Sequence, residues 1–137
     1  RVSKSDSYME PVSPFDDTEA KILNLVQSPD GKFVAFERYG EGLYLMNSNG
    51  DNLRFLGKAY RPSWSPDSRY LVAMETQDNG YTFTAAELVV FGTDSLTRVE
   101  ITTKTDLITL NPSWSPYGDS ILFNDPETGH VYLLPLR

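Results

Sequence analysis

The chain has 137 residues, 12 lysines and arginines against 19 aspartates and glutamates, a net charge of −7 and no cysteine. This length fits one domain, and the lack of cysteine excludes disulfides, thiolate metal sites and cysteine nucleophiles. An acidic chain lacks the basic face that nucleic acid requires, and no apolar run is long enough to span a bilayer. We therefore expect no nucleic-acid partner and no membrane insertion.

Residues 1–17 predict an extended N-terminal arm. Pro11 and Pro14 exclude a helix there, and the arm is expected either to stay loose or to pair with the edge of a sheet. The first residue is Arg1 instead of methionine, which we interpret as the trace of a removed export signal. Together with the lack of cysteine, this favours an exported protein of the bacterial periplasm or cell envelope.

A short pattern occurs three times in the rest of the chain, at intervals of roughly 40 to 50 residues. Each copy is a Ser-Pro turn followed by an apolar run. In Ser-Pro-Asp-Gly the serine accepts a nearby hydrogen bond, the proline fixes φ and the glycine takes positive φ. The residues of this structural repeat core are Ser28, Pro29, Asp30, Gly31, Trp64, Ser65, Pro66, Asp67, Trp114, Ser115 and Pro116.

The strand that follows each turn is apolar without alternation, which is typical of a strand covered on both faces. Sheets stacked side by side around an axis cover their strands in this way, whereas a two-layer sandwich would leave one face exposed. A second strand and an alternating outer strand follow in the first two copies. The predicted strands include 22–26, 33–36, 43–46, 52–56, 70–74, 87–91, 96–101, 121–123 and 130–134.

These features predict an all-β fold of β-propeller blades and essentially no helix. The three four-stranded antiparallel blades are expected in residues 18–57, 58–103 and 104–137, and the third lacks its outer strand, which leaves eleven strands. Trp64 and Trp114 directly precede their turns and are expected to wedge between blades.

The sequence Pro-Ser-Trp-Ser-Pro at 62–66 and 112–116 resembles the TolB-type, WD-like β-propeller repeat, and the resemblance extends over residues 22–136. Gln27, Ser68 and Tyr117 depart from the pattern within its turns. The resemblance implies a propeller that serves either as a non-catalytic binding module or as the accessory, gating propeller of a prolyl-oligopeptidase- or tricorn-like peptidase. In the second case the catalytic domain would lie outside this chain.

Three blades do not close a ring, because closed propellers have about four to eight. Two completions are open. Two chains could form a six-bladed ring in which the arm at 8–15 supplies the missing outer strand, or the chain could be part of a longer one with further blades.

No catalytic or metal-binding constellation is expected. Gly-x-Ser-x-Gly does not occur, and the single histidine, His130, opens a strand as a rim residue. The stretch 47–58 fails as a calcium loop, because Asn52 and Lys58 stand where glycine and a bidentate glutamate are needed. We expect no catalytic residue, no cofactor and no metal.

The binding candidates lie in loops that the repeat does not explain. Three such loops join equivalent strands, so the fold should place them on one face of the ring. Their aromatic and charged residues suit a protein or peptide partner, and Tyr81 and Phe83 also suit a carbohydrate. The candidates are Arg38, Tyr39, Glu41, Asp78, Tyr81, Phe83, Glu127 and His130.

Overall fold

A computed structural model describes residues 21–78, 83–94, 97–101 and 109–136. These residues form eleven strands and no helix, and hence no helix that could cross a membrane. The strands are β1 (Ile22–Gln27), β2 (Phe33–Arg38), β3 (Gly42–Asn47), β4 (Arg54–Gly57), β5 (Ala59–Trp64), β6 (Tyr70–Asp78), β7 (Phe83–Gly92), β8 (Arg98–Glu100), β9 (Leu110–Trp114), β10 (Ser120–Asp125) and β11 (His130–Pro135).

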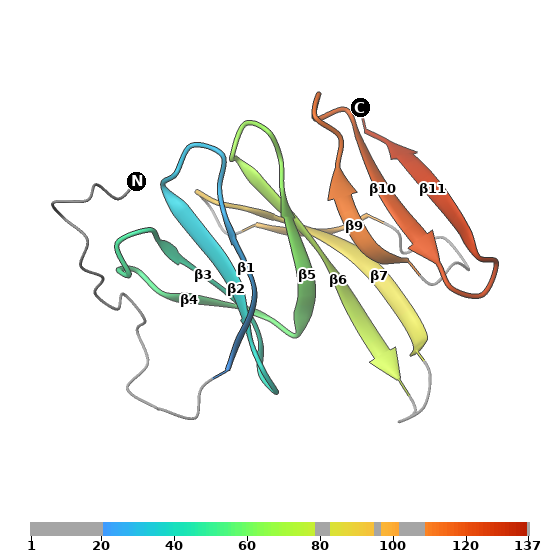
Figure 1. Cartoon of the computed structure of the whole chain (residues 1–137), viewed down its shortest axis with the longest axis horizontal. Coiled ribbons are helices and arrows are strands. Elements are labelled where there is room, and N and C mark those ends of the chain that lie inside the picture. The colour runs from blue at the N-terminus through green and yellow to red at the C-terminus, as the bar shows by residue number, and fades with distance from the viewer. Residues whose placement is uncertain (1–20, 79–82, 95–96, 102–108, 137) are drawn as a thin grey trace, which may run out of the picture.

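The strands form three separate antiparallel sheets in chain order, which confirms the predicted all-β fold. Blade 1 is β1–β4, blade 2 is β5–β8, and blade 3 is β9–β11. Blade 2 lies between the other two (Figure 1). The stack is not closed on itself, as expected for part of a propeller.

The hydrophobic core lies between the blades. One cluster joins blade 1 to blade 2 and includes Ala35, Leu45 and Leu71, which are 0%, 1% and 0% exposed. A second cluster joins blade 2 to blade 3 and includes Val72 and Ile121. Because Leu71 and Val72 are neighbours on one strand and belong to different clusters, β6 is covered on both faces, as its continuous apolar run predicts.

The Ser-Pro turns close on themselves through the same hydrogen bonds in blades 1 and 2. Ser65 Oγ donates to Asp67 Oδ1 at 2.7 Å, and Tyr70 N donates to Ser65 Oγ at 3.0 Å. Ser28 and Asp30 repeat the first of these bonds at 2.6 Å. The side chains of the turn therefore satisfy donors that a loop end would otherwise leave to water.

The third turn keeps its shape with a different acid. Tyr117 replaces the capping aspartate and is 90% exposed, and Ser115 Oγ instead donates to Asp119 Oδ1 at 2.9 Å. Gly118 supplies the positive φ of 77° at this turn. The turn thus tolerates loss of the repeat's aspartate because another carboxylate lies within reach.

The tryptophan of blade 2 lies against blade 1. Trp64 is 9% exposed, its Nε1 donates to Val26 O at 3.1 Å, and its ring stacks on Phe33 with centroids 6.2 Å apart. Trp114 is half-buried in the second cluster, and its backbone N donates to Ser63 Oγ at 3.2 Å. Both side chains thus join neighbouring blades.

The turn aspartates should make stability fall in acid. The Ser65 hydroxyl and the Arg69 amide donate to Asp67 and hold its pKa below the usual 3.8. Because the folded pKa is lower than the unfolded one, the contribution is present above the unfolded value and is lost as pH falls through the folded value. Asp67 is exposed, so we expect less than about 1 kcal/mol.

Asp67→Asn tests this effect, because it keeps the acceptor oxygen and removes the titration. Urea unfolding at about pH 7 and about pH 3 should show a smaller difference in the free energy of unfolding for the variant than for the parent chain. An unchanged difference would contradict the assignment.

Candidate functional site

The described hairpin turns between the second and third strands, β2–β3 and β10–β11, lie on the lower side of the stack in Figure 1. This side is called the loop face here. Arg38, Tyr39 and Glu41 lie in the β2–β3 hairpin, and Glu127 and His130 lie in the β10–β11 hairpin. Asp78 and Phe83 end β6 and begin β7, but their side chains, like all of Tyr81, lie outside the described residues.

In the first hairpin the charged candidates pair with one another. Arg38 Nη1 lies 3.1 Å from Glu41 Oε2, and the hydroxyl of Tyr44 donates to Glu41 Oε1 at 2.6 Å. The accepting carboxylate raises the pKa of Tyr44, so this hydroxyl stays protonated at neutral pH. Tyr39, at the tip, is 72% exposed and is the candidate there most accessible to a partner.

In the third hairpin a buried acid shapes the turn. Asp125 is 2% exposed, and its Oδ1 accepts a hydrogen bond from Glu127 N at 3.2 Å. The side chains of Glu127 and His130 are exposed, and the His130 ring meets Tyr132 edge-on at 6.2 Å. The two described hairpins therefore present their candidate residues on separate blades, not in one cluster.

The innermost strands carry a feature that the sequence reasoning missed. Asn24, Arg61 and Asn111 each lie four residues before the turn serine of their blade, and each has positive φ, of 50°, 57° and 54°. Residues with side chains rarely adopt this conformation. At each of these positions the register of the inner strand shifts against its neighbour, which marks a β-bulge.

The bulges turn backbone N–H groups toward the preceding blade. Arg61 N donates to Glu37 Oε2 at 2.8 Å, and Asn111 N donates to Met74 Sδ at 3.3 Å. Glu37 and Met74 hold the same place in their blades, nine residues after the turn serine. A hydrogen bond from the bulge N–H to the same position of the preceding blade therefore joins blade 1 to blade 2 and blade 2 to blade 3.

Around the bulges lies a cavity of about 420 Å³, open to solvent, which we call the hub cavity. Its lining residues come from the inner strands of all three blades and are Asn24, Leu25, Val26, Arg61, Pro62, Asn111 and Pro112. The Asn24 amide is held by Glu37, and Asn111 Nδ2 donates to Asn124 Oδ1 at 2.9 Å. Arg61 is exposed and makes no ion pair among the described residues.

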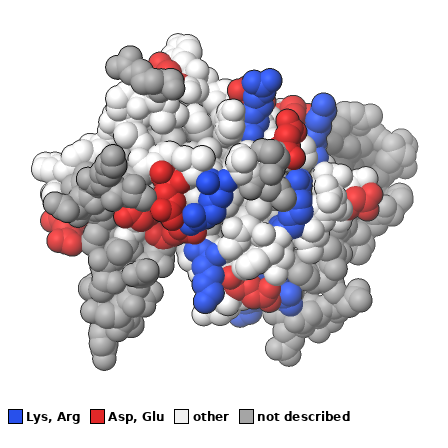
Figure 2. Space-filling model, turned by 180° about the vertical axis from the view of Figure 1, so that it is seen from behind, with Lys and Arg blue, Asp and Glu red and all other residues white. Residues whose placement is uncertain are grey.

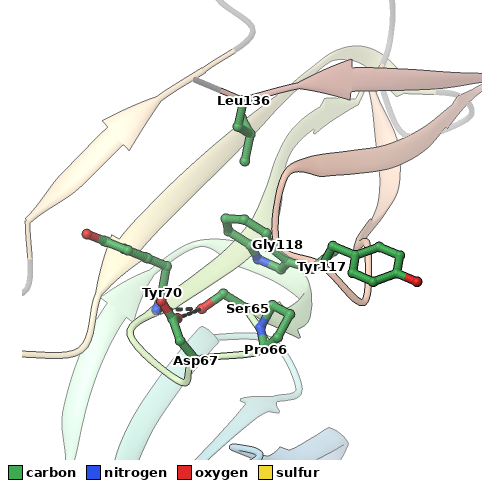
Figure 3. Close-up of a pocket in the computed structure, with 8 residues that line it drawn as sticks. Ser65, Pro66, Asp67, Tyr70, Tyr117, Gly118 and Leu136 are labelled. Carbon is green, nitrogen blue, oxygen red and sulfur yellow. Dashed lines mark hydrogen bonds between the residues drawn. The ribbon is translucent and has the colours of Figure 1, made fainter.

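A second cavity, of about 340 Å³, lies between blades 2 and 3 at the Ser-Pro turns (Figure 3). Tyr70 and Tyr117 point away from each other there, and Leu136 reaches in from the opposite side. Two of its polar residues, Ser65 and Asp67, are already bonded to each other, and the buried Trp114 Nε1 has no hydrogen-bond partner among the described residues. This cavity is a groove between packed blades without converging functional groups.

The side chains around the hub cavity are suited to binding another molecule. No group of three or more potential metal ligands occurs among the described residues. On the face shown in Figure 2, acidic and basic side chains are interspersed and form no continuous basic patch. The hub cavity combines a guanidinium, amides and apolar proline and leucine surface, which suits a polar chain segment with an acidic group.

The chain matches solved propeller structures over most of its length. A structure assigned as TolB from Agrobacterium tumefaciens is 24% identical with a TM-score of 0.68, over 88% of this chain and 44% of that one. The β-propeller domain of the Trilobed protease from Pyrococcus furiosus is 18% identical with a TM-score of 0.56, over 84% and 44%. The tricorn protease is 12% identical with a TM-score of 0.61, over 80% and 11%.

The fold is that of a TolB-like β-propeller. The chain spans less than half of the length of each of these structures. No family model matches the sequence, and no curated protein matches it either. The comparisons therefore establish the fold.

Proposed function

We propose that this chain is a non-catalytic TolB-like propeller module that binds a protein or peptide partner in the cell envelope. The observation that carries the proposal is the hub cavity, which three equivalent bulges line with Asn24, Arg61 and Asn111. The envelope location is supported by the likeness to a TolB structure and by the absence of cysteine.

The charge distribution indicates which part of a partner the hub cavity prefers. Glu37 is 6% exposed and its Oε2 is already bonded to Asn24 and to the backbone of Arg61. The exposed Arg61 guanidinium has no ion pair in the described part of the chain. Although the whole chain carries a net charge of −7, this guanidinium attracts a carboxylate locally. The partner segment therefore presents an acidic side chain or a free C-terminus.

A random-peptide library displayed on phage, selected against the immobilised chain, tests the proposal. We expect enriched peptides to contain acidic residues and to lose affinity by about tenfold in Arg61→Ala, because a charge-assisted hydrogen bond is worth roughly 1.5 kcal/mol or more. Lys58→Ala, an exposed cation outside the hub cavity, is the control and should leave affinity unchanged. Failure to enrich any peptide, or equal effects of the two variants, would contradict it.

A second candidate is an accessory propeller that restricts substrate entry to a peptidase. It is favoured by the likeness to the tricorn protease and to the Trilobed protease propeller domain. The full reading frame separates the two candidates, since the second requires a hydrolase domain. A carbohydrate ligand is a third candidate, and it requires glycan binding that Tyr81→Ala and Phe83→Ala abolish.

A further inference from the structure

The turn between β3 and β4 holds an asparagine beside a glycine. Asn49 precedes Gly50 in the stretch that fails as a calcium loop. The backbone nitrogen of the residue after an asparagine can attack the side-chain amide, which makes asparagine one of the thermolabile residues. Glycine leaves that nitrogen most open to react, because it has no Cβ. Two of the seven asparagines in the sequence precede a glycine, and the other, Asn79, lies outside the described residues.

Backbone hydrogen bonds hold this turn in place. Gly50 N donates to Asn47 O at 2.9 Å, and Asn47 N donates to Asp51 O at 2.8 Å. Gly50 takes a φ of 96°, which residues with a side chain rarely adopt. The turn therefore keeps the nitrogen of Gly50 at the end of the hairpin, next to the exposed Asn49.

Asp51 holds the side-chain amide of Asn49 at both of its polar atoms. Asp51 N donates to Asn49 Oδ1 at 3.0 Å, and Asn49 Nδ2 donates to Asp51 Oδ2 at 3.2 Å. The donor at Oδ1 polarises the carbonyl and stabilises the negative charge that this oxygen gains when Cγ is attacked, as the donors of an oxyanion hole do. The nucleophile, the carbonyl and the donor therefore come from three consecutive residues.

We propose that Asn49 is a self-modification site, at which the folded chain converts its own asparagine into iso-aspartate and aspartate. Gly50 N forms a bond to Asn49 Cγ, the bond between Cγ and Nδ2 breaks, and the proton of Gly50 N leaves with Nδ2 as ammonia. The product is a cyclic imide. Water then adds to one carbonyl carbon of the ring and breaks the bond from that carbon to Gly50 N. Attack at Cγ gives aspartate, and attack at the backbone carbonyl gives iso-aspartate.

Both products change the turn. A neutral amide becomes a carboxylate, which adds one negative charge to the net −7 and places it beside Asp51. Repulsion between like charges thus replaces the hydrogen bond from Asn49 Nδ2 to Asp51 Oδ2. In iso-aspartate the main chain also runs through Cγ and gains one methylene, within the bonds that join Asn47 to Gly50 and to Asp51.

The modification also bears on the contact between blades 1 and 2. The turn leads into β4, where Arg54 Nη1 donates to Thr93 O of blade 2 at 3.2 Å. A longer turn alters the register in which β4 pairs with β3, because loop length and register are linked in a hairpin. The modified chain therefore differs from the parent chain in charge and in the outer strand of blade 1.

Peptide mapping of the folded chain tests the proposal. The chain is kept at neutral pH and physiological temperature in water labelled with heavy oxygen, and is then digested with trypsin in ordinary water. Residues 39–54 leave as one peptide, and fragmentation in a mass spectrometer assigns the label to single residues. Asn52, which is exposed and precedes Leu53, is the control within the same peptide. We expect Asn49 to take up heavy oxygen at least about tenfold faster than Asn52, because the unhindered Gly50 N is held beside it.

The products identify the route. The cyclic imide opens to both iso-aspartate and aspartate, whereas direct hydrolysis of the amide by water gives aspartate alone. An iso-aspartyl methyltransferase methylates the first product and leaves ordinary aspartate unmodified. We therefore expect the peptide 39–54 of the incubated chain to become a substrate of this enzyme.

Gly50→Ala tests the nucleophile. The added methyl hinders the nitrogen, so the rate at Asn49 should fall to that at Asn52. Circular dichroism checks the fold of the variant, since φ at this position is 96°. If the variant does not fold, the rate and the products of the parent chain decide.

Three results would overturn the proposal. In the first, Asn49 of the folded parent chain keeps its amide as long as Asn52 does. In the second, the modified residue is aspartate without iso-aspartate. In the third, the folded Gly50→Ala variant is modified at the rate of the parent chain.

Discussion

Replacing Trp64 by alanine should lower the free energy of unfolding by about 3 to 5 kcal/mol, as is usual for a large buried aromatic side chain. Trp64 is 9% exposed, stacks on Phe33 and donates from Nε1 to Val26 O. The substitution therefore opens a cavity between blades 1 and 2 and removes the indole donor of the Val26 carbonyl. Urea unfolding, followed by circular dichroism, measures the loss.

Tyr117→Ala is the control for this experiment, because Tyr117 is a large aromatic residue that is 90% exposed. Substitutions at exposed positions of this kind usually change the free energy of unfolding by less than about 0.5 kcal/mol. A loss for Trp64→Ala no larger than that of the control would show that Trp64 does not join the blades.

Replacing Glu37 by alanine should cost about 1 to 3 kcal/mol. Glu37 is 6% exposed and accepts hydrogen bonds from Asn24 Nδ2 and from Arg61 N, which lie on different blades. Removing the acceptor deletes two part-buried hydrogen bonds to a carboxylate, and hydrogen bonds to a charged group contribute on the order of 1 to 3 kcal/mol. The effect exceeds that of a surface carboxylate because Glu37 is buried and its bond to Arg61 N joins blades 1 and 2.

The repeat itself supplies the matched control. Met74 occupies the position of Glu37 in blade 2 and accepts Asn111 N through its sulfur. Glu37→Met should therefore retain a weak acceptor and most of the side-chain volume, and should lose less stability than Glu37→Ala in the same urea titration. Equal losses would mean that the bulge N–H does not depend on its acceptor.

The strands and their stacking could be predicted because each blade repeats one turn and one apolar run. The β2 and β6 segments are apolar on both sides, and only a sheet with neighbours on both faces has that requirement. The outer strands were less predictable. Predicted strands at 52–56 and 96–101 correspond to β4 and β8, which are shorter, since half-exposed edge residues carry a weak pattern.

The hub cavity could not be predicted from composition, because φ is not visible in a residue's identity when the residue is asparagine or arginine. Arg61 with φ of 57° is held there by the Glu37 bond, which is a tertiary contact. The only sequence signal was positional, since Asn24, Arg61 and Asn111 stand at the same distance from their turns. The loop residues were placed by connectivity alone, and Tyr81 lies outside the described residues.

The side-by-side stacking of blades carries the whole account, and nuclear Overhauser effects test it most directly. In a spectrum of the isotope-labelled chain, the indole N–H of Trp64 should show cross-peaks to protons of Val26, and its ring protons should show cross-peaks to Phe33. These groups lie on different blades and are brought together only by stacking. A folded chain whose Trp64 indole shows neither contact, and meets residues of its own sheet alone, would contradict the account.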